Sequence, residues 1–124
     1  MLNFKPLDPN VSIVQQFDTD SKEPIVLFNL FSVDEADIPA VLEAWTADAT
    51  FLKGQPGYIN TQLHQAIGGS NLFFNYAVWE TVELFASAFN HPDFQNTLGK
   101  YPNSAVSSPH LFKRLTVPNL CVGP

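Results

Sequence analysis

The chain has little cysteine, little positive charge and no long apolar run. Its single cysteine, Cys121, cannot form an internal disulfide and lies in a proline-bounded tail, where we assign it no chemistry. Six Lys and Arg stand against twelve Asp and Glu, and the net charge of -6 excludes the basic surface that nucleic acids and anionic membranes attract. No window approaches the roughly 18 apolar residues of a transmembrane helix, and the N-terminal residues lack a signal-peptide pattern. We therefore expect a cytoplasmic protein without nucleic-acid or membrane partners.

Motifs for metal, phosphate and covalent chemistry are missing as well. The three histidines, His64, His91 and His110, lack the spacing of metal ligands, and the chain has no glycine-rich phosphate loop, nucleophile elbow or cysteine pair. His91 precedes Pro92 between two helical patterns, so capping of the second helix is its simplest role. The sequence predicts no metal site.

What the chain does have is apolar and aromatic mass. Its 124 residues are 45% hydrophobic and 13% aromatic, which is enough for one domain with a proper core. Aromatic rings suit either a core or a pocket for a flat ligand, and composition does not choose between them. We expect an N-terminal arm at residues 1–23 with a short strand at 11–17, a domain at 24–116, and a C-terminal tail at 117–124.

The apolar patterns within the domain predict the element order β-α-β-β-α-β. Helical spacing predicts one helix over residues 34–53 and two short helical pieces between Thr81 and Gly99. Continuous or alternating apolar runs predict strands at residues 25–31, 58–66, 72–79 and 110–116.

This order is that of the ferredoxin-like α+β fold. Right-handed crossovers place the first and third strands in the centre of a four-stranded antiparallel sheet, with the helices on one face. The other face is left bare, and the outward side of the second strand, which carries Tyr58, Asn60, Gln62 and His64, is amphiphilic. A homodimer that covers this face is the expected assembly.

Two asparagines, Asn29 and Asn75, interrupt apolar strands. A primary amide in such surroundings costs about 1 to 3 kcal/mol unless its donors and acceptors are satisfied. The two lie on neighbouring predicted strands, and Asn75 shares one strand face with Ala77 and Trp79. An amide, a small residue and a flat ring fit the wall of a pocket for an aromatic ligand. Alternatively, the two amides bond each other and the nearby backbone, and Trp79 belongs to the core.

An ordered set of motifs runs through the domain: Gln55-Pro-Gly-Tyr-Ile59, Thr61-Gln-Leu-His64, Asn75-Tyr-Ala-Val-Trp79-Glu80, Phe85, Ala88-Phe89, His91-Pro-Asp-Phe94 and Ser108-Pro-His-Leu-Phe-Lys-Arg114. Over residues 24–116 this set resembles the antibiotic biosynthesis monooxygenase family of dimeric α+β barrels. The resemblance implies a homodimer that oxidises an electron-rich phenol or hydroquinone with O2, without metal, flavin or other cofactor.

The resemblance also implies residue roles. It assigns the catalytic roles to Asn75 and Trp79. An ionised hydroquinone can itself reduce O2, so the protein has to favour the anion, exclude water and stabilise developing charge through amide and indole donors. Phe85 stands where the oxygenases have a tyrosine. We expect the substrate to contact Asn29, Trp45, His64 and Phe85.

Two alternatives remain open. One is a non-catalytic protein that binds an aromatic small molecule, and Phe85 favours it because phenylalanine cannot carry a proton. The other is the haem-degrading branch of the same fold, whose first-strand asparagine is matched by Asn29. The tryptophan and histidine of that branch fall here at Ala88 and near Thr97. Since haem iron needs an axial donor, this reading depends on His91 or another substitute.

Overall fold

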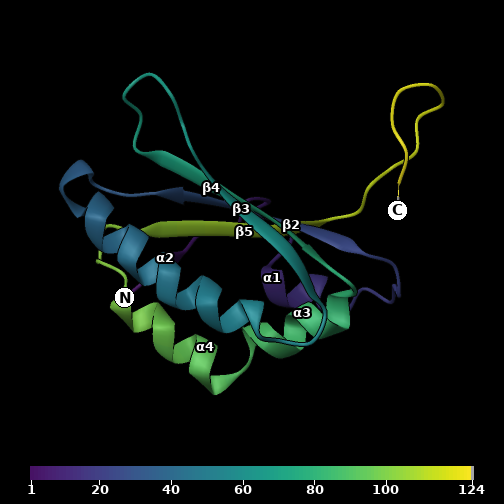
Figure 1. The fold of residues 1–124 in the computed structure, drawn as a ribbon, viewed down its shortest axis with the longest axis horizontal. Coiled ribbons are helices and arrows are strands. Elements are labelled where there is room, and N and C mark those ends of the chain that lie inside the picture. The colour runs from purple at the N-terminus through teal and green to yellow at the C-terminus, as the bar shows by residue number, and fades with distance from the viewer. Residues whose placement is uncertain (124) are drawn as a thin grey trace.

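The computed structural model describes residues 1–123 as a single sheet with helices on one side (Figure 1). Its strands are β1 (Asn3–Phe4), β2 (Ile25–Ser32), β3 (Tyr58–Gln65), β4 (Leu72–Trp79) and β5 (Val106–Phe112). Its helices are α1 (Ile13–Gln16), α2 (Ile38–Lys53), α3 (Val82–Phe89) and α4 (Pro92–Thr97), with 3-10 turns η1 (Glu35–Asp37) and η2 (Leu98–Lys100). The run from β2 to β5 confirms the predicted β-α-β-β-α-β order. None of the helices described is long and apolar enough to span a bilayer.

The sheet has the strand order β1-β5-β2-β4-β3, so β2 and β4 are central, as predicted. The expected four-stranded antiparallel sheet is nevertheless wrong, because β1 adds a fifth strand that runs parallel to β5. Only Asn3 and Phe4 form β1, and two residues are too few to produce a periodic pattern. The result is a mixed sheet.

The predicted strand at residues 11–17 is also wrong, since α1 lies there. Ser12 and Gln15 form a capping box, in which each side chain accepts a hydrogen bond from the other residue's backbone N–H, at 3.2 and 2.7 Å. The neighbouring Gln16 then covers the open edge of β5, because its Oε1 accepts from the backbone N–H of Leu111 at 2.7 Å. This amide takes the place that a further strand would have occupied on that edge.

The last strand spans Val106–Phe112, whereas the sequence predicted residues 110–116. The stretch before His110 contains Pro102 and Pro109, and proline has no N–H to donate to a sheet. Pro109 pairs with Asn29 of β2, while β1 pairs with β5 only at Val106 and Ser107. Proline is tolerated at such a position because one side of the strand has no partner strand there.

A β-bulge at Ile59 changes the faces of β3. The register shifts between Tyr58 and Asn60, so that Tyr58 pairs with Trp79 and Thr61 pairs with Ala77. Residues paired across neighbouring strands share a face. Tyr58 therefore points to the helix side with Thr61, and its predicted place beside His64 on the outer side is wrong.

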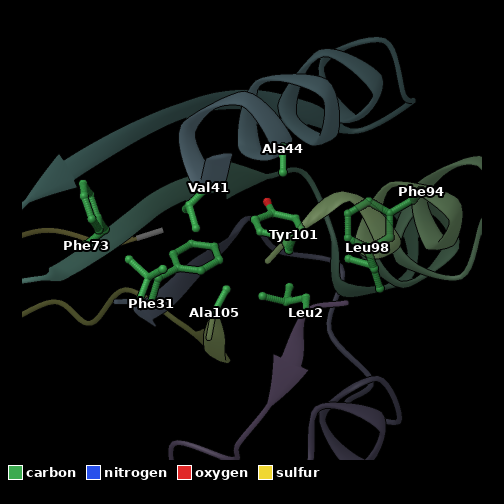
Figure 2. Packing of buried hydrophobic residues seen from close by; sticks show 10 residues of the cluster. Leu2, Phe31, Val41, Ala44, Phe73, Phe94, Leu98, Tyr101 and Ala105 are labelled. Atoms are coloured by element: carbon green, nitrogen blue, oxygen red, sulfur yellow. The ribbon is translucent and has the colours of Figure 1, made fainter. Parts of the chain in front are cut away.

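Buried apolar side chains fill the space between the sheet and the helices in two clusters. One cluster joins Phe31 and Tyr101 to Leu2 from the N-terminal arm, and Figure 2 shows the hydroxyl of Tyr101 pointing toward α2 beside Ala44. The second cluster packs α3 against β2 and β4 through residues such as Phe85. The arm thus contributes to the core of the domain.

Candidate active site

A cavity lies between the sheet and the helices. Its volume is about 50 Å³, which holds roughly four water molecules and is about a third of the roughly 150 Å³ of an engineered cavity that admits benzene. Its walls come from β2 to β5, from α2 and α3, from the α4–η2 segment and from the N-terminal arm. The residues that line it are Leu2, Phe4, Leu27, Asn29, Phe31, Trp45, Asp48, Ala49, Leu52, Tyr58, Thr61, Asn75, Ala77, Trp79, Phe85, Phe89, Phe94, Leu98, Ser107 and Pro109.

The two predicted asparagines lie opposite each other across β2 and β4. The amide oxygen of Asn75 accepts a hydrogen bond from Thr61 Oγ1 on β3 at 2.5 Å, and that of Asn29 accepts from Ser107 Oγ on β5 at 2.6 Å. The idea that the amides bond each other is therefore not what the structure shows. Hydroxyl groups on the two flanking strands hold the oxygens, so the orientation of each amide is fixed.

The amide nitrogens of Asn29 and Asn75 are left free to donate, since no residue from 1 to 123 accepts a hydrogen bond from either. Within the same residues, no fully enclosed side-chain nitrogen or oxygen lacks a partner. The two NH2 groups must therefore reach open space, and the space beside both residues is the cavity. An adjacent pair of amide donors in an apolar cavity is suited to an oxygen atom that carries negative charge.

Trp79 forms an aromatic corner of the cavity and is only 1% exposed. Its indole ring packs edge-on against Tyr58, with ring centroids 5.7 Å apart, and against Phe85 at 5.4 Å. Phe85 in turn contacts Phe17 of the N-terminal arm and Phe89 of α3, both with centroids 6.0 Å apart. Rings in edge-to-face contact leave flat apolar walls that suit an aromatic ligand.

The cavity also holds a carboxylate that the sequence did not single out. Asp48 lines the cavity from α2 and is 8% exposed, and its Oδ2 accepts a hydrogen bond from the Tyr101 hydroxyl at 2.6 Å. Burial raises the pKa of Asp48 from 3.8 to about 6, although the hydrogen bond from Tyr101 acts in the opposite direction. Burial, and then the charge of Asp48, raise the pKa of the Tyr101 hydroxyl, so it remains a donor.

A signal for Asp48 was present in the helix pattern. Trp45, Asp48, Ala49 and Leu52 follow the i, i+3, i+4, i+7 spacing of one helix face, and all four line the cavity. A charged residue within an apolar stripe is unusual enough to mark a site. The supporting hydroxyls of Thr61 and Ser107 carried no such signal, because serine and threonine are common on strands.

The structure gathers Asn29, Trp45, Asn75, Trp79 and Phe85 around the cavity. His64 is not brought there. It pairs with Phe74 on the opposite face of the sheet and stacks on that ring with centroids 4.2 Å apart.

The other two histidines have local structural contacts. His91 Nδ1 accepts from the Asp93 backbone N–H at 3.0 Å and caps α4, as predicted, while His110 Nδ1 contacts Gln16 Nε2 at 3.2 Å. Neither lines the cavity. In the described part of the chain, no group of three or more His, Cys, Asp or Glu could hold a metal ion.

The N-terminal arm closes one side of the cavity with Leu2 and Phe4. Leu2 is 5% exposed, and its backbone N–H donates to the carbonyl of Leu98 at 2.9 Å. Phe4 pairs with Ser107 on β5 and is 44% exposed, so its ring lies between the cavity and solvent. No pattern in the sequence indicated that the arm would belong to the site.

Known proteins similar to this chain share both its fold and the region that carries the cavity. The antibiotic biosynthesis monooxygenase model matches residues 24–100. A cofactor-independent oxygenase from Streptomyces nogalater, SnoaB, has a solved structure that is 26% identical, with a TM-score of 0.69, and the match covers 78% of this chain and 99% of that one. A candidate monooxygenase from Shewanella loihica is 30% identical, with a TM-score of 0.67 and the same coverage. A comparison with curated proteins finds no match.

The family model covers the strands β2, β3 and β4 and the helices α2, α3 and α4, which together carry the paired amides and Trp79. The family match confirms the resemblance predicted from the sequence motifs. This chain belongs to the antibiotic biosynthesis monooxygenase family.

Proposed function

We propose that this protein is a cofactor-independent monooxygenase that oxidises an electron-rich phenol or hydroquinone with O2. The observation that carries the proposal is the pair of amide NH2 groups of Asn29 and Asn75, held by hydroxyls and facing an aromatic cavity. The likeness to SnoaB, a cofactor-independent oxygenase, supports the same reaction class.

The residues of this chain suit the demands of that reaction. A hydroquinone anion supplies all the electrons that reduce O2, one oxygen atom stays on the product and the other leaves as water. The amide donors of Asn29 and Asn75 stabilise negative charge on the ring oxygen, and the Trp79 indole is a further donor at the same wall. The surrounding aromatic rings exclude water, which strengthens these interactions. Asn75 and Trp79 are therefore the proposed catalytic residues.

The size of the cavity bears on the substrate. At about 50 Å³ it is smaller than a cavity that admits benzene, so even a single-ring hydroquinone needs a wall to move. A polycyclic substrate would need a larger movement of the same wall. Trp45 and Phe85 are held within the domain, whereas Phe4 is half-exposed on a two-residue strand, so Phe4 is the wall that yields most easily.

We also propose a homodimer formed through the open sheet face, by which we mean the outward residues Phe28, Phe74, Tyr76, His64 and Phe112. The rings of Phe28 and Phe74 stack with centroids 5.1 Å apart, and Phe112 meets Phe28 edge-on at 6.2 Å. Tyr76 and Phe112 are 39% and 47% exposed. An aromatic patch of this kind favours burial against a second copy, and His64 would then serve the interface. A cytoplasmic location stays a prediction from the sequence.

Haem does not suit this cavity. None of the three histidines lines it, and its volume of about 50 Å³ is far too small for a macrocycle. A binding protein without turnover is the remaining alternative, and it uses the same walls and donors. Only the fate of the bound ligand separates it from an oxygenase.

The deciding experiment is an aerobic screen of hydroquinones and anthrones with ¹⁸O2, following quinone absorbance and the mass of the product. An oxygenase forms quinone with one labelled oxygen atom per turnover, and the Asn75→Leu variant loses this activity. The matched control, Asn96→Leu, makes the same chemical change at an exposed position on α4 and keeps it. Tight binding of these compounds without labelled product would establish the binding protein and refute the oxygenase.

A further inference from the structure

Asp48 is the only side chain with a carboxylate among the described residues that line the cavity. It reaches the cavity from α2, across from the sheet that carries Asn29 and Asn75. It is 8% exposed, and so deeply buried a carboxylate is costly unless it is bonded or used. Its single hydrogen-bond partner among residues 1–123 is Tyr101.

The two oxygens of Asp48 have different surroundings. Oδ2 accepts from the Tyr101 hydroxyl at 2.6 Å, and Tyr101 is itself 2% exposed and packed in the core. Oδ1 accepts no hydrogen bond from the described chain. Every fully enclosed side-chain oxygen in that part of the chain has a partner, so Oδ1 is not fully enclosed. Tyr101 therefore orients the carboxylate and leaves Oδ1 open to the cavity.

Few other charges act on this group. The elements whose backbones lie closest to α2 are η1, β3, α4 and η2, and side chains of β2 and β4 also pack against it. Of their titratable side chains only Tyr58 also lines the cavity, and His91 and Lys100, for example, lie toward the surface. The titratable groups on or next to these elements are Asp34, Glu35 and Asp37 at η1, Tyr58 and His64 of β3, Tyr76 and Glu80 at β4, His91 and Asp93 of α4, Lys100 of η2 and the N-terminal ammonium group, which donates to the backbone oxygen of Tyr101. The helix α2 itself also carries Glu43 and Lys53.

We propose that Asp48 accepts the proton of the substrate's phenolic hydroxyl, so that the cavity binds the neutral phenol and forms the phenolate in place. The O–H bond of the phenol breaks, the proton moves to Oδ1 of Asp48, and the electron pair stays on the phenolate oxygen. This inference rests on the proposed function, because it supplies the anion that O2 then oxidises. It also answers the question raised by Phe85, which cannot take that proton.

The charge balance of the cavity explains why the neutral phenol enters. Burial lifts the pKa of Asp48 to about 6, so the group is ionised at neutral pH and ready to accept a proton. A phenolate that approached from solvent would meet the negative charge of Asp48 at short range in an apolar site. A neutral phenol can instead donate to Oδ1, and the amide donors of Asn29 and Asn75, which face the same cavity, stabilise the negative charge that develops on the phenol oxygen as its proton leaves.

The test measures binding of 4-nitrophenol, which is electron-poor and resists oxidation, so no turnover is needed. Its dissociation constant is followed by tryptophan fluorescence from about pH 5 to about pH 9, across the pKa values of Asp48 and of the ligand. For the wild-type protein we expect the tightest binding between the two pKa values, with weaker binding on both sides. In the Asp48→Asn variant, the loss of affinity below pH about 6 should disappear. Its affinity should instead increase as the pH rises past the pKa of the ligand, because the neutral cavity accepts the phenolate.

Two further variants separate a proton acceptor from a merely structural carboxylate. Tyr101→Phe removes the hydrogen bond that lowers the pKa of Asp48, so the acidic limb should move to higher pH. Glu43→Gln makes the same kind of charge change as Asp48→Asn, on the exposed side of α2, and should leave the profile unchanged. At neutral pH, Asp48→Asn should bind the neutral ligand about tenfold more weakly.

The outcomes distinguish this inference from the oxygenase itself. Identical pH profiles for the wild-type protein and Asp48→Asn would overturn it, as would absence of 4-nitrophenol binding to the wild-type protein throughout the range. Quinone formation with the same pH dependence of kcat/KM in both proteins would leave the oxygenase standing and refute the role of Asp48. The expected binding profiles without any quinone would instead support the proton acceptor and refute the oxygenase.

Discussion

Replacing Asp48 with asparagine should make the folded protein more stable at neutral pH. The folded-state pKa of this carboxyl is about 6, against 3.8 for a solvated group, so the folded protein binds the proton more tightly than the unfolded chain. Stability is then greatest below pH 3.8, falls as the pH rises toward about 6, and stays level above it. With about 1.4 kcal/mol for each pKa unit, the charge of Asp48 costs roughly 3 kcal/mol at pH 7.

The Asp48→Asn variant removes this charge with almost no change of shape. Its amide oxygen can still accept the hydrogen bond from Tyr101, so the loss on that side is small. We expect a gain in unfolding free energy of about 1 to 3 kcal/mol at pH 7, because the neutral amide accepts a weaker hydrogen bond from Tyr101 than the carboxylate does. The gain should vanish well below pH 3.8, where the wild-type carboxyl is protonated in both states.

Urea unfolding at several pH values tests the magnitude and the sign together. The wild-type protein should lose stability between about pH 4 and pH 6, the variant should not, and Glu43→Gln should follow the wild-type curve. A wild-type stability that rises over this range would refute the reasoning. So would an Asp48→Asn variant that is less stable at pH 7, since both results would mean that Asp48 is well satisfied as an anion.

Three further predictions address the amide pair, the sheet face and the arm. Asn75→Leu should cost about 1 kcal/mol of stability, because the Thr61 hydroxyl loses its acceptor, and should weaken 4-nitrophenol binding about tenfold. In the double variant with Thr61→Val, thermal unfolding should show restored stability, whereas the affinity for 4-nitrophenol should stay low. Phe74→Glu should give a monomer by light scattering where the wild-type protein is a dimer, and a wild-type monomer at micromolar concentration would contradict the proposed interface. Phe4→Ala should improve the affinity for a tricyclic phenol relative to 4-nitrophenol by several-fold. Its stability cost should stay below about 1 kcal/mol because the ring is 44% exposed. If calorimetry gives the same ratio of the two affinities for the variant and the wild-type protein, Phe4 is not the limiting wall.

The sequence was informative where a pattern extended over many residues. The apolar runs of β2 and β4 and the helical spacing of α2 each span at least eight residues, so their positions and the central place of β2 and β4 followed from periodicity and crossover handedness. Local caps were also readable, since both Thr81 and His91 accept a hydrogen bond at the start of a helix, as predicted. The site residues on the two central strands were found for the same reason.

What the sequence did not reveal depends on contacts between distant segments. The strand β1 exists because Asn3 and Phe4 meet β5, about a hundred positions later, and two residues have no pattern of their own. The bulge that turns Tyr58 inward is a matter of register with β4. The partnership of Asp48 with Tyr101 joins residues 53 positions apart and becomes visible only when α2 and the segment after η2 lie together.

The position of the arm has a consequence for how such a protein can change. The stretch that matches the family, residues 24–100, supplies the paired amides, Trp79 and the carboxylate of Asp48. The wall that limits the size of the ligand comes in part from Leu2 and Phe4, which lie outside that stretch. For the proposed oxygenase, the reacting groups and part of the wall that limits ligand size are therefore encoded in separate segments, and we expect exchange of a few residues before β2 to alter which molecules enter while those groups stay in place.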